Sequence, residues 1–310
     1  MRILIAGATG AIGRPLVRCL KENRHSVFAL ARSPESSRTE TELGAEPILA
    51  DALDAASVKA AVARVRPDAI INELTSLPRH YTAEEMKAAA ERDRKVRSEG
   101  NANLLMALRN AGVRRYLLQS SGFWYAPGVG LADEREPFAF DASAAVAAGA
   151  RRYAELEAAA SDRPGVEFVS LRYGFFYGPG TWYNREDDMG EQVRQQQVPV
   201  IGDGQGVWSF VHIDDAAAAT AAALECAPGA YNVVDSDPSA QSVWLPAFAL
   251  AVGAPAPPRI AEEDALRTLG PDEVYYATRL RGASNEKASR ELNFHPRPLE
   301  WLSATRPSRN

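Results

Sequence analysis

The sequence predicts an α/β fold built on a doubly wound parallel sheet, with a smaller C-terminal α/β subdomain. Short apolar runs alternate with segments of helical period, which is the pattern of strands joined by crossover helices. Three glycines, Gly7, Gly10 and Gly13, separate the first apolar run from the first helical segment, as in a strand–turn–helix unit. With 310 residues, 46% hydrophobic and 24% charged, the chain has room for one large unit or two modest domains of a soluble globular protein.

Each strand is predicted from an apolar run bounded by turn or charged residues. The expected strands are residues 2–6, 26–31, 47–51, 68–75, 116–121, 166–172 and 230–234. The expected helices are a segment from 14 to about 23, a segment ending at 65, residues 98–112 and 141–161, a segment ending at 224, and residues 239–252. The charge-rich residues 76–94 are expected to form, for the most part, a solvated helix start rather than a loop over the site.

The turn from Gly7 to Gly13 predicts a dinucleotide site. Glycine lets the backbone bend sharply and bring its N–H groups against a pyrophosphate, and the dipole of the following helix favours negative charge. Arg32 stands at the end of the second strand, where an acidic residue would accept from ribose hydroxyls and a cation would meet a 2′-phosphate. Arg32 and Ser33 therefore predict NADP(H), with NAD(H) less favoured, and Arg14 or Arg38 could assist.

Composition limits the other function classes. The net charge of −5 gives no sign of nucleic-acid binding, and no apolar run reaches the 18 residues of a membrane span. Cys19 and Cys226 have no metal-ligand pattern around them, so no metal site is expected. The first residues read as a strand rather than a signal peptide, which makes the cytoplasm the default location. The expected partner is a small-molecule substrate.

Motifs along nearly the whole chain carry a family resemblance. They are the Gly-x-x-Gly-x-x-Gly turn, Ser120-Ser121 with Tyr125, residues 171–180, residues 211–215, Tyr231-Asn232-Val233 and residues 284–288. In this order they resemble the extended, epimerase/dehydratase branch of the short-chain dehydrogenase/reductase superfamily. The resemblance implies a Rossmann-type NADP-binding domain of residues 1–178 plus 206–236 and a substrate-binding subdomain of 179–205 plus 237–310. With the turn itself, it implies cofactor contacts from Gly7, Thr9, Gly10, Ala11, Ile12, Gly13, Arg32, Ser33, Asp51, Ala52, Leu53, Leu74, Thr75, Ser120, Tyr173, Gly174 and Phe175.

The catalytic residues of that family are only partly present. Its members usually use a Ser or Thr with a Tyr-x-x-x-Lys pair, because a nearby cation lowers the pKa of the phenol enough for proton exchange. Ser121 matches the serine, but no lysine occurs between Lys95 and Lys287. If Glu157 matches the family's glutamate, Gly149 stands in the tyrosine position and Tyr153 in the lysine position. Arg97 also replaces a frequent structural asparagine.

Three hypotheses follow from an intact cofactor site without the usual proton donor. The first is an atypical NADP(H)-dependent oxidoreductase that reduces a carbonyl or conjugated bond with another proton donor or water. Ser121 and Tyr125 are then the catalytic candidates, because they share a loop, with Tyr177, Tyr183, Tyr81 and His80 as alternatives and His212 as a structural residue. The second is a redox-neutral epimerase, dehydratase or cyclase, and the third is a non-catalytic NADP(H) sensor.

The aromatic content of the subdomain bears on the substrate. Around the predicted site lie Phe123, Trp124, Phe175, Phe176, Trp182, Tyr183 and Trp208, which favours a flat, apolar or aromatic ligand. A nucleotide sugar would need cations for its pyrophosphate, and Arg185, Arg194, Arg279 and Arg281 are available for that role. Family members often dimerise through helices equivalent to residues 98–112 and 141–161, so the resemblance makes a homodimer an expectation.

Overall fold

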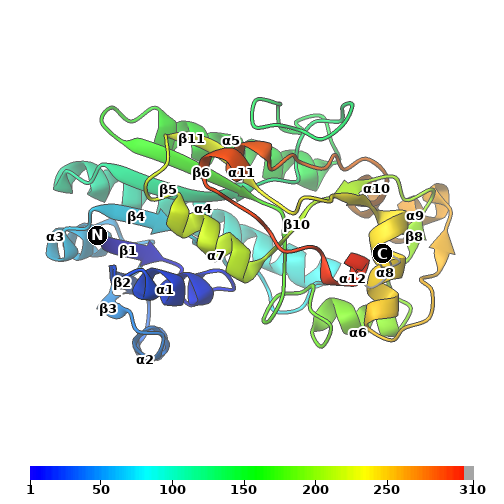
Figure 1. The fold of residues 1–310 in the computed structure, drawn as a ribbon, viewed down its shortest axis with the longest axis horizontal. Helices are drawn as coiled ribbons and strands as arrows, with labels where there is room; N and C mark the ends of the chain where they lie inside the picture. The colour runs from blue at the N-terminus through cyan, green and yellow to red at the C-terminus, as the bar shows by residue number, and fades with distance from the viewer. Residues whose placement is uncertain (304–310) are drawn as a thin grey trace.

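Residues 1–303 are described by the computed structural model, and seven parallel strands among them form the central sheet (Figure 1). The sheet order is β11-β6-β5-β4-β1-β2-β3, which is doubly wound about β1 as the sequence predicts. The strands are β1 (Arg2–Ala6), β2 (Ser26–Ala31), β3 (Glu46–Leu49), β4 (Ala69–Asn72), β5 (Arg115–Ser121), β6 (Glu167–Tyr173) and β11 (Gly229–Val233).

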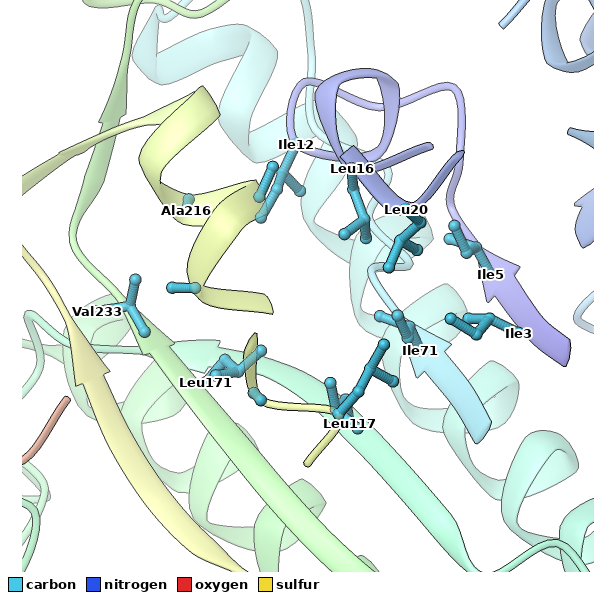
Figure 2. Packing of buried hydrophobic residues seen from close by; sticks show 14 of the residues in the cluster. Ile3, Ile5, Ile12, Leu16, Leu20, Ile71, Leu117, Leu171, Ala216 and Val233 are labelled. Atoms are coloured by element: carbon cyan, nitrogen blue, oxygen red, sulfur yellow. The ribbon is translucent and has the colours of Figure 1, made fainter. Parts of the chain in front are cut away.

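Helices cover both faces of the sheet and bury separate apolar cores. On one face, α1 (Gly13–Glu22) and α7 (Ile213–Ala222) pack on the strands, and Figure 2 shows Leu16, Leu20 and Ala216 meeting strand residues of that core. On the other face lie α3 (Ala55–Val65), α4 (Ala83–Ala111) and α5 (Ala144–Ser161). Strands buried on both faces explain the continuous apolar runs of the sequence.

Two of the helices that cover the sheet differ from the sequence prediction. Helix α4 begins at Ala83, where the Thr82 hydroxyl accepts from the Glu85 N–H at 3.2 Å, so most of residues 76–94 form a helix start as expected. The helix then continues without a break through the predicted helix 98–112 as far as Ala111. Helix α2 (Pro34–Glu42) is not predicted from its polar sequence. A capping box between Ser33 and Ser36 and a proline in its first turn specify it locally.

The remaining elements form the smaller subdomain and its connections. They are β7 (Phe175–Tyr177), α6 (Asp188–Arg194), β8 (Val200–Ile201), β9 (Val207–Trp208), β10 (Phe210–His212), β12 (Ser239–Ala240), α8 (Gln241–Ala251), β13 (Arg259–Ile260), α9 (Glu262–Thr268), α10 (Pro271–Thr278), α11 (Glu286–Glu291) and α12 (Glu300–Ser303). The subdomain core is aromatic, with Trp208, Trp244 and Trp301 buried and Trp124 and Trp182 packed against it. The chain then returns to the sheet, because Ala288, Leu292 and Phe294 belong to the core under α1 and α7.

Parallel register brings the strand ends to one edge. Ala6 pairs with Leu30 and Asn72, and Ser121 pairs with Tyr173, so the residues that follow these strands all emerge at the same edge. That edge faces the subdomain, on the right of the sheet in Figure 1. No helix within residues 1–303 combines the length and apolar character needed to cross a bilayer.

Candidate cofactor and active site

The glycine turn after β1 has the close backbone packing that a dinucleotide site requires. Gly7 has φ of +99°, and a Cβ there would lie 2.4 Å from the Glu73 carbonyl oxygen. A Cβ on Gly13 would lie 2.2 Å from the Gly7 carbonyl oxygen. No side chain caps the start of α1, but the Arg14 N–H donates to the Gly10 carbonyl oxygen at 3.2 Å and Pro15 has no N–H. An anionic group at this helix start would therefore be held by N–H groups of the turn that precedes Arg14. This arrangement fits the pyrophosphate of a dinucleotide.

The other residues of the turn differ in exposure. Thr9 and Ala11 are half-buried and Gly10 is exposed, whereas the Ile12 side chain is buried in the core against α7. The Arg14 guanidinium donates to the Thr9 carbonyl oxygen at 2.9 Å, which stiffens the turn. The accessible surface of the turn is therefore mostly backbone.

Arg32, Ser33 and Asp51 lie at the ends of β2 and β3 and differ in their contacts. Arg32 is exposed and makes no ion pair with any part of residues 1–303. The Ser33 hydroxyl accepts from the Ser36 N–H at 3.2 Å and so caps α2. The Asp51 carboxylate accepts from the Leu53 N–H at 2.9 Å, which orders the turn that also contains the half-buried Ala52.

Along β4, β5 and β6 several predicted cofactor contacts have side chains directed into the protein. Leu74 packs on Gly100, where a Cβ would lie 2.8 Å from its Cδ1 atom. The Ser120 hydroxyl donates to Glu157 at 2.6 Å, and the Tyr173 hydroxyl lies 2.6 Å from Thr220 Oγ1. Ser120 and Tyr173 are buried, so a contact from either of them to a cofactor would have to come from backbone, whereas Leu74 is half-buried. At the same edge, Thr75 and Phe175 are half-buried and Gly174 is buried.

Tyr125 is part of a buried polar network. Its hydroxyl donates to Asn232 Oδ1 at 2.6 Å and accepts from Arg172 at 2.9 Å. Arg172 in turn holds Glu157, whose pKa burial would raise but whose hydrogen bonds from Arg172 lower it below the usual range. Burial raises the pKa of Tyr125 to about 12. This location argues against Tyr125 as the proton donor, since its hydroxyl is already used on both sides.

Ser121 is also buried, at the end of β5. Its hydroxyl accepts from the Phe123 N–H at 3.4 Å, a long contact that leaves the hydroxyl able to turn toward a ligand. Ser121 and Tyr125 therefore share a loop, as the sequence predicts, but their hydroxyls belong to different surroundings. The structure does not bring them together as a pair.

A tryptophan ring covers Gly149, the residue that the family resemblance aligns with the catalytic tyrosine if Glu157 matches the family's glutamate. The Trp124 ring lies directly on Gly149 of α5, where a Cβ would sit 2.4 Å from two ring carbons. Tyr153, one turn further along α5, is buried below it and its ring lies 5.6 Å from the Trp124 ring. Trp124 Nε1 donates to the Tyr276 hydroxyl at 2.9 Å, so its indole is fixed at both ends.

Arg97 of α4 supplies a positive charge next to Tyr153. The buried Arg97 guanidinium stands 5.3 Å from the centre of the Tyr153 ring and pairs with Asp93 at 2.8 Å. The other oxygen of Asp93 accepts from the Ser76 N–H at 2.7 Å, which fixes the chain just beyond β4. Positive charge is therefore present beside Tyr153, but it is carried by a guanidinium that does not exchange protons near neutral pH.

Around Trp124 the aromatic side chains form one cluster. Phe123 stacks on Phe175 with ring centres 4.1 Å apart, and Phe175 stacks on Trp208 at 4.4 Å. Tyr276 meets Phe175 at 6.1 Å and Trp208 at 5.8 Å. We call Phe123, Trp124, Phe175, Trp208 and Tyr276 the aromatic cluster; all but Trp208 are partly exposed.

The alternative proton donors fall in three different places. Tyr177 is buried against His212 and Trp301, away from the aromatic cluster. Tyr81 contacts Trp182 at 4.9 Å, and Tyr183 packs on Phe175 at 5.9 Å, so both lie beside the cluster. His80 is exposed and pairs with Asp188. His212 caps α7 through its Nδ1 atom, which is the structural role expected for it.

Sequence reasoning missed two carboxyl groups near this edge. Glu73 directly follows β4, and burial raises its pKa to about 8; one of its oxygens has no partner within residues 1–303. Glu273 precedes Tyr276 on α10, and burial, followed by the charge of Asp272, raises its pKa. The sequence could have indicated Glu73, because a glutamate that directly follows an apolar strand lies at the ligand-binding edge of the sheet. No local pattern in the sequence indicates Glu273.

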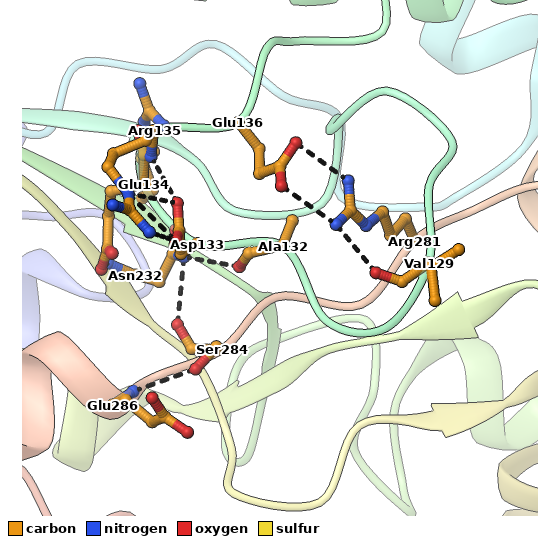
Figure 3. A network of polar contacts seen from close by, with 11 residues as sticks. Val129, Ala132, Asp133, Glu134, Arg135, Glu136, Asn232, Arg281, Ser284 and Glu286 are labelled. Carbon is orange, nitrogen blue, oxygen red and sulfur yellow. Dashed lines mark hydrogen bonds and ion pairs between the residues drawn. The ribbon is translucent and has the colours of Figure 1, made fainter.

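Three of the four arginines proposed for a substrate pyrophosphate have their side chains engaged elsewhere. Arg281 is buried and donates to the carbonyl oxygens of Val129 and Gly130, with Glu136 as its ion-pair partner (Figure 3). Arg194 donates to the backbone of Arg185, and Arg279 stands 3.8 Å from Glu262. The cationic set that a nucleotide sugar needs is therefore not assembled beside the aromatic cluster.

Comparison with known proteins adds relatives of both sequence and fold. A "3-diazoavenalumate denitrifying reductase" from Streptomyces is 39% identical over 310 residues, covering 97% of this chain and 98% of the relative. A "2-alkyl-3-oxoalkanoate reductase" from Stenotrophomonas maltophilia is 29% identical over 272 residues, covering 82% of this chain and 77% of the relative. These reductases support an NAD(P)-dependent oxidoreductase.

Solved structures share the fold at low sequence identity. A human epimerase family protein with NADPH gives a TM-score of 0.72 at 20% identity, covering 98% of this chain and 97% of that one. The UDP-glucose 4-epimerase of Thermus thermophilus with NAD gives 0.69 at 23% identity, covering 97% and 96%. Neighbours of this fold thus bind either nicotinamide dinucleotide. The sequence profile of the NAD dependent epimerase/dehydratase family matches residues 3–233, most of the chain, and the protein therefore belongs to that family.

Proposed function

We propose that this protein is an NADPH-dependent reductase that delivers hydride to an electron-poor aromatic small molecule and displaces a diazo group as N2. The observation that carries the proposal is the contact of Trp124 with Gly149. It fills the place of the usual proton-donating tyrosine with an apolar ring. A reaction that needs no proton at the reacting atom loses nothing by that replacement.

The dinucleotide half of the proposal rests on the glycine turn and on Arg32. When bound, the reduced dinucleotide supplies a hydride and is oxidised to NADP⁺. The uncapped start of α1 and the backbone of the turn would hold its pyrophosphate. Arg32, free of any ion pair within residues 1–303, would hold the 2′-phosphate.

The substrate half rests on the aromatic cluster. Its partly exposed rings offer an apolar, aromatic surface at the carboxyl edge of the sheet, where ligands of such folds bind. The Streptomyces relative is named as a denitrifying reductase of a diazo acid. A related substrate class fits this surface better than a nucleotide sugar, because Arg281 and Arg194 are engaged with backbone.

The chemistry of denitrification explains why the reaction would not need the Tyr-x-x-x-Lys pair of the family. At the substrate carbon a C–H bond forms from the hydride, the C–N bond breaks, and N2 leaves with the bonding electron pair. No proton is transferred in that step. Reduction of a ketone differs, because the oxygen must receive a proton as the hydride arrives, and a positioned acid contributes there.

The test is an assay with 3-diazo-4-hydroxybenzoate and NADPH deuterated at C4 in each stereochemical position. We expect NADPH oxidation with release of N2, and one deuterium on the ring carbon from one of the two labelled cofactors. In D2O with unlabelled NADPH the ring carbon should carry no deuterium. NADPH oxidation with both nitrogens retained would overturn the proposal, as would binding of NADPH without turnover, which the sensor hypothesis predicts.

Ketone reduction is the second candidate, favoured by the Stenotrophomonas relative at 29% identity. A 2-alkyl-3-oxoalkanoate tested in the same assay separates the two. Turnover of the oxo acid, together with no N2 from the diazo compound, would favour this candidate and would require a proton donor beside the aromatic cluster.

A further inference from the structure

One face of α10 meets the position left by the missing catalytic tyrosine. Glu273 and Tyr276 are one helical turn apart on α10, so their side chains lie on the same side of the helix. Tyr276 accepts from Trp124 Nε1 at 2.9 Å, and Trp124 rests on Gly149. The carboxylate of Glu273 is thereby brought to the edge of the aromatic cluster.

Electrostatic interactions place Glu273 among tyrosines from three segments. After burial, the charge of Glu273 is the largest influence that raises the pKa of Tyr81 and of Tyr183, and it also raises the pKa of Tyr276. The other acidic group acting on Glu273 is Asp272, which accepts from the Ala145 N–H at 3.3 Å. Glu273 therefore lies within electrostatic range of three phenol groups and of a like charge.

Glu273 has no compensating cation in the protein. It is partly buried, yet it forms neither an ion pair nor a hydrogen bond with residues 1–303. Two other glutamates do have a cation nearby: Glu262 stands 3.8 Å from Arg279, and Glu136 forms an ion pair with Arg281. A partly desolvated carboxylate without a partner is unfavourable by itself and is relieved when a cation comes within a few ångströms.

We propose that Glu273 is the counter-charge for a cationic group on an aromatic ligand whose ring rests on the aromatic cluster. Phenol and indole faces attract a desolvated cation, and the carboxylate adds a direct charge interaction. In an arenediazonium, and in the zwitterion formed when an ortho hydroxyl ionises, the positive charge lies on the diazo group. The inference therefore rests on the proposed function and places that group next to Glu273.

A matched pair of stable ligands tests this directly. We would measure binding of 3-hydroxyphenyltrimethylammonium and of 3-tert-butylphenol, which share a shape and differ in charge, to the full chain saturated with NADP⁺. The cation should bind at least tenfold more tightly than the neutral compound. In Glu273→Gln this preference should fall to about onefold, with the affinity for 3-tert-butylphenol unchanged.

Two further variants keep the test decisive. Glu263→Gln alters an exposed carboxylate on α9 and should leave the preference unchanged. Glu273→Asp keeps the charge and should retain part of the preference, which a packing effect of Glu273→Gln would not predict. A melting curve and NADPH titration of each variant confirm that it is folded; equal cation preference in the native chain and in folded Glu273→Gln overturns the inference.

The outcomes for this inference and for the proposed function remain separate. A cation preference lost in Glu273→Gln, in a chain that does not release N2 from the diazo compound, supports Glu273 as counter-charge and rejects denitrification. Release of N2 at an unchanged KM in Glu273→Gln supports denitrification and rejects the role of Glu273.

Discussion

At the scale of single residues, the proposed function makes Arg32 the residue that selects NADPH over NADH. Its guanidinium is exposed at the end of β2 and unpaired within residues 1–303. A hydrogen bond to a charged group contributes roughly 1.5–3 kcal/mol, so Arg32→Ala should weaken NADPH binding by about ten- to a hundredfold. NADH binding should not change, because it lacks the 2′-phosphate.

Titration of both cofactors by fluorescence checks this prediction. Arg18→Ala, which removes an exposed arginine from α1, is the matched control and should leave both affinities unchanged. Equal weakening of NADPH and NADH in Arg32→Ala would contradict a specific contact to the 2′-phosphate.

Glu73 should make stability depend on pH. Its pKa is raised by burial to about 8, above the value of about 4.3 expected in the unfolded chain. Between these values the unfolded state releases a proton that the native state keeps, so this group lowers stability as pH rises, by roughly 1.4 kcal/mol per pH unit. Glu73→Gln cannot ionise and removes that loss.

Urea unfolding of both chains at pH 5, 6, 7 and 8 measures the effect. The free energy of unfolding of Glu73→Gln, minus that of the native chain, should increase with each step up in pH. The difference between the two chains isolates Glu73 from Glu40 and Asp235, whose pKa values burial also raises. Parallel pH profiles would show that Glu73 is ionised in the native state.

At the scale of elements, α5 packs against the loop after β5 through the contact of Gly149 with the Trp124 ring. Gly→Ala in an exposed helix interior normally stabilises by about 1 kcal/mol. At Gly149 the added Cβ would lie 2.4 Å from the Trp124 ring, so Gly149→Ala should instead destabilise the protein by roughly 1–3 kcal/mol.

A double-mutant cycle separates this contact from helix propensity. Trp124→Ala removes the ring, and in that background Gly149→Ala should no longer destabilise. Ala148→Gly, at an exposed position of the same helix, serves as the control and should cost about 1 kcal/mol whether or not Trp124 is present. Stabilisation by Gly149→Ala in the native background would contradict the contact.

At the scale of the whole molecule, the sheet and the subdomain should unfold together. Residues Ala288, Leu292 and Phe294 return from the subdomain into the core under α1 and α7, and Val146 of α5 belongs to the aromatic core of the subdomain. Local unfolding of either part would therefore expose apolar surface of the other. A single cooperative transition is expected in spite of the chain's size.

The five tryptophans make this measurable. All of them belong to or pack against the subdomain core, so tryptophan fluorescence reports that part, while far-UV circular dichroism reports every helix and strand. The two urea transitions should coincide, and NADPH at about a hundred times its Kd should move both by about 2.7 kcal/mol. A fluorescence transition that precedes the other would show that the subdomain unfolds independently.

Prediction from sequence succeeded where the signal was local. The seven strands and the turn from Gly7 to Gly13 were predicted because strand and turn preferences are set by neighbouring residues. Helix α2 was missed because it has almost no apolar face, and its capping box is a weaker signal than periodicity. Tyr125 was chosen for its closeness to Ser121 in the chain, but its hydroxyl meets Asn232, which lies more than a hundred residues away.

The sequence by itself determined the α/β class, the parallel sheet, the dinucleotide turn and the absence of lysine from residues 96–286, because these depend on local pattern or on composition. Only the tertiary structure decided what surrounds Gly149, the residue that the family resemblance aligns with the catalytic tyrosine. Trp124, Gly149, Tyr276 and Glu273 come from three separate segments, and no pattern in any of them reveals the others. Their meeting is fixed by packing of the aromatic core, a long-range free energy that sequence spacing does not report.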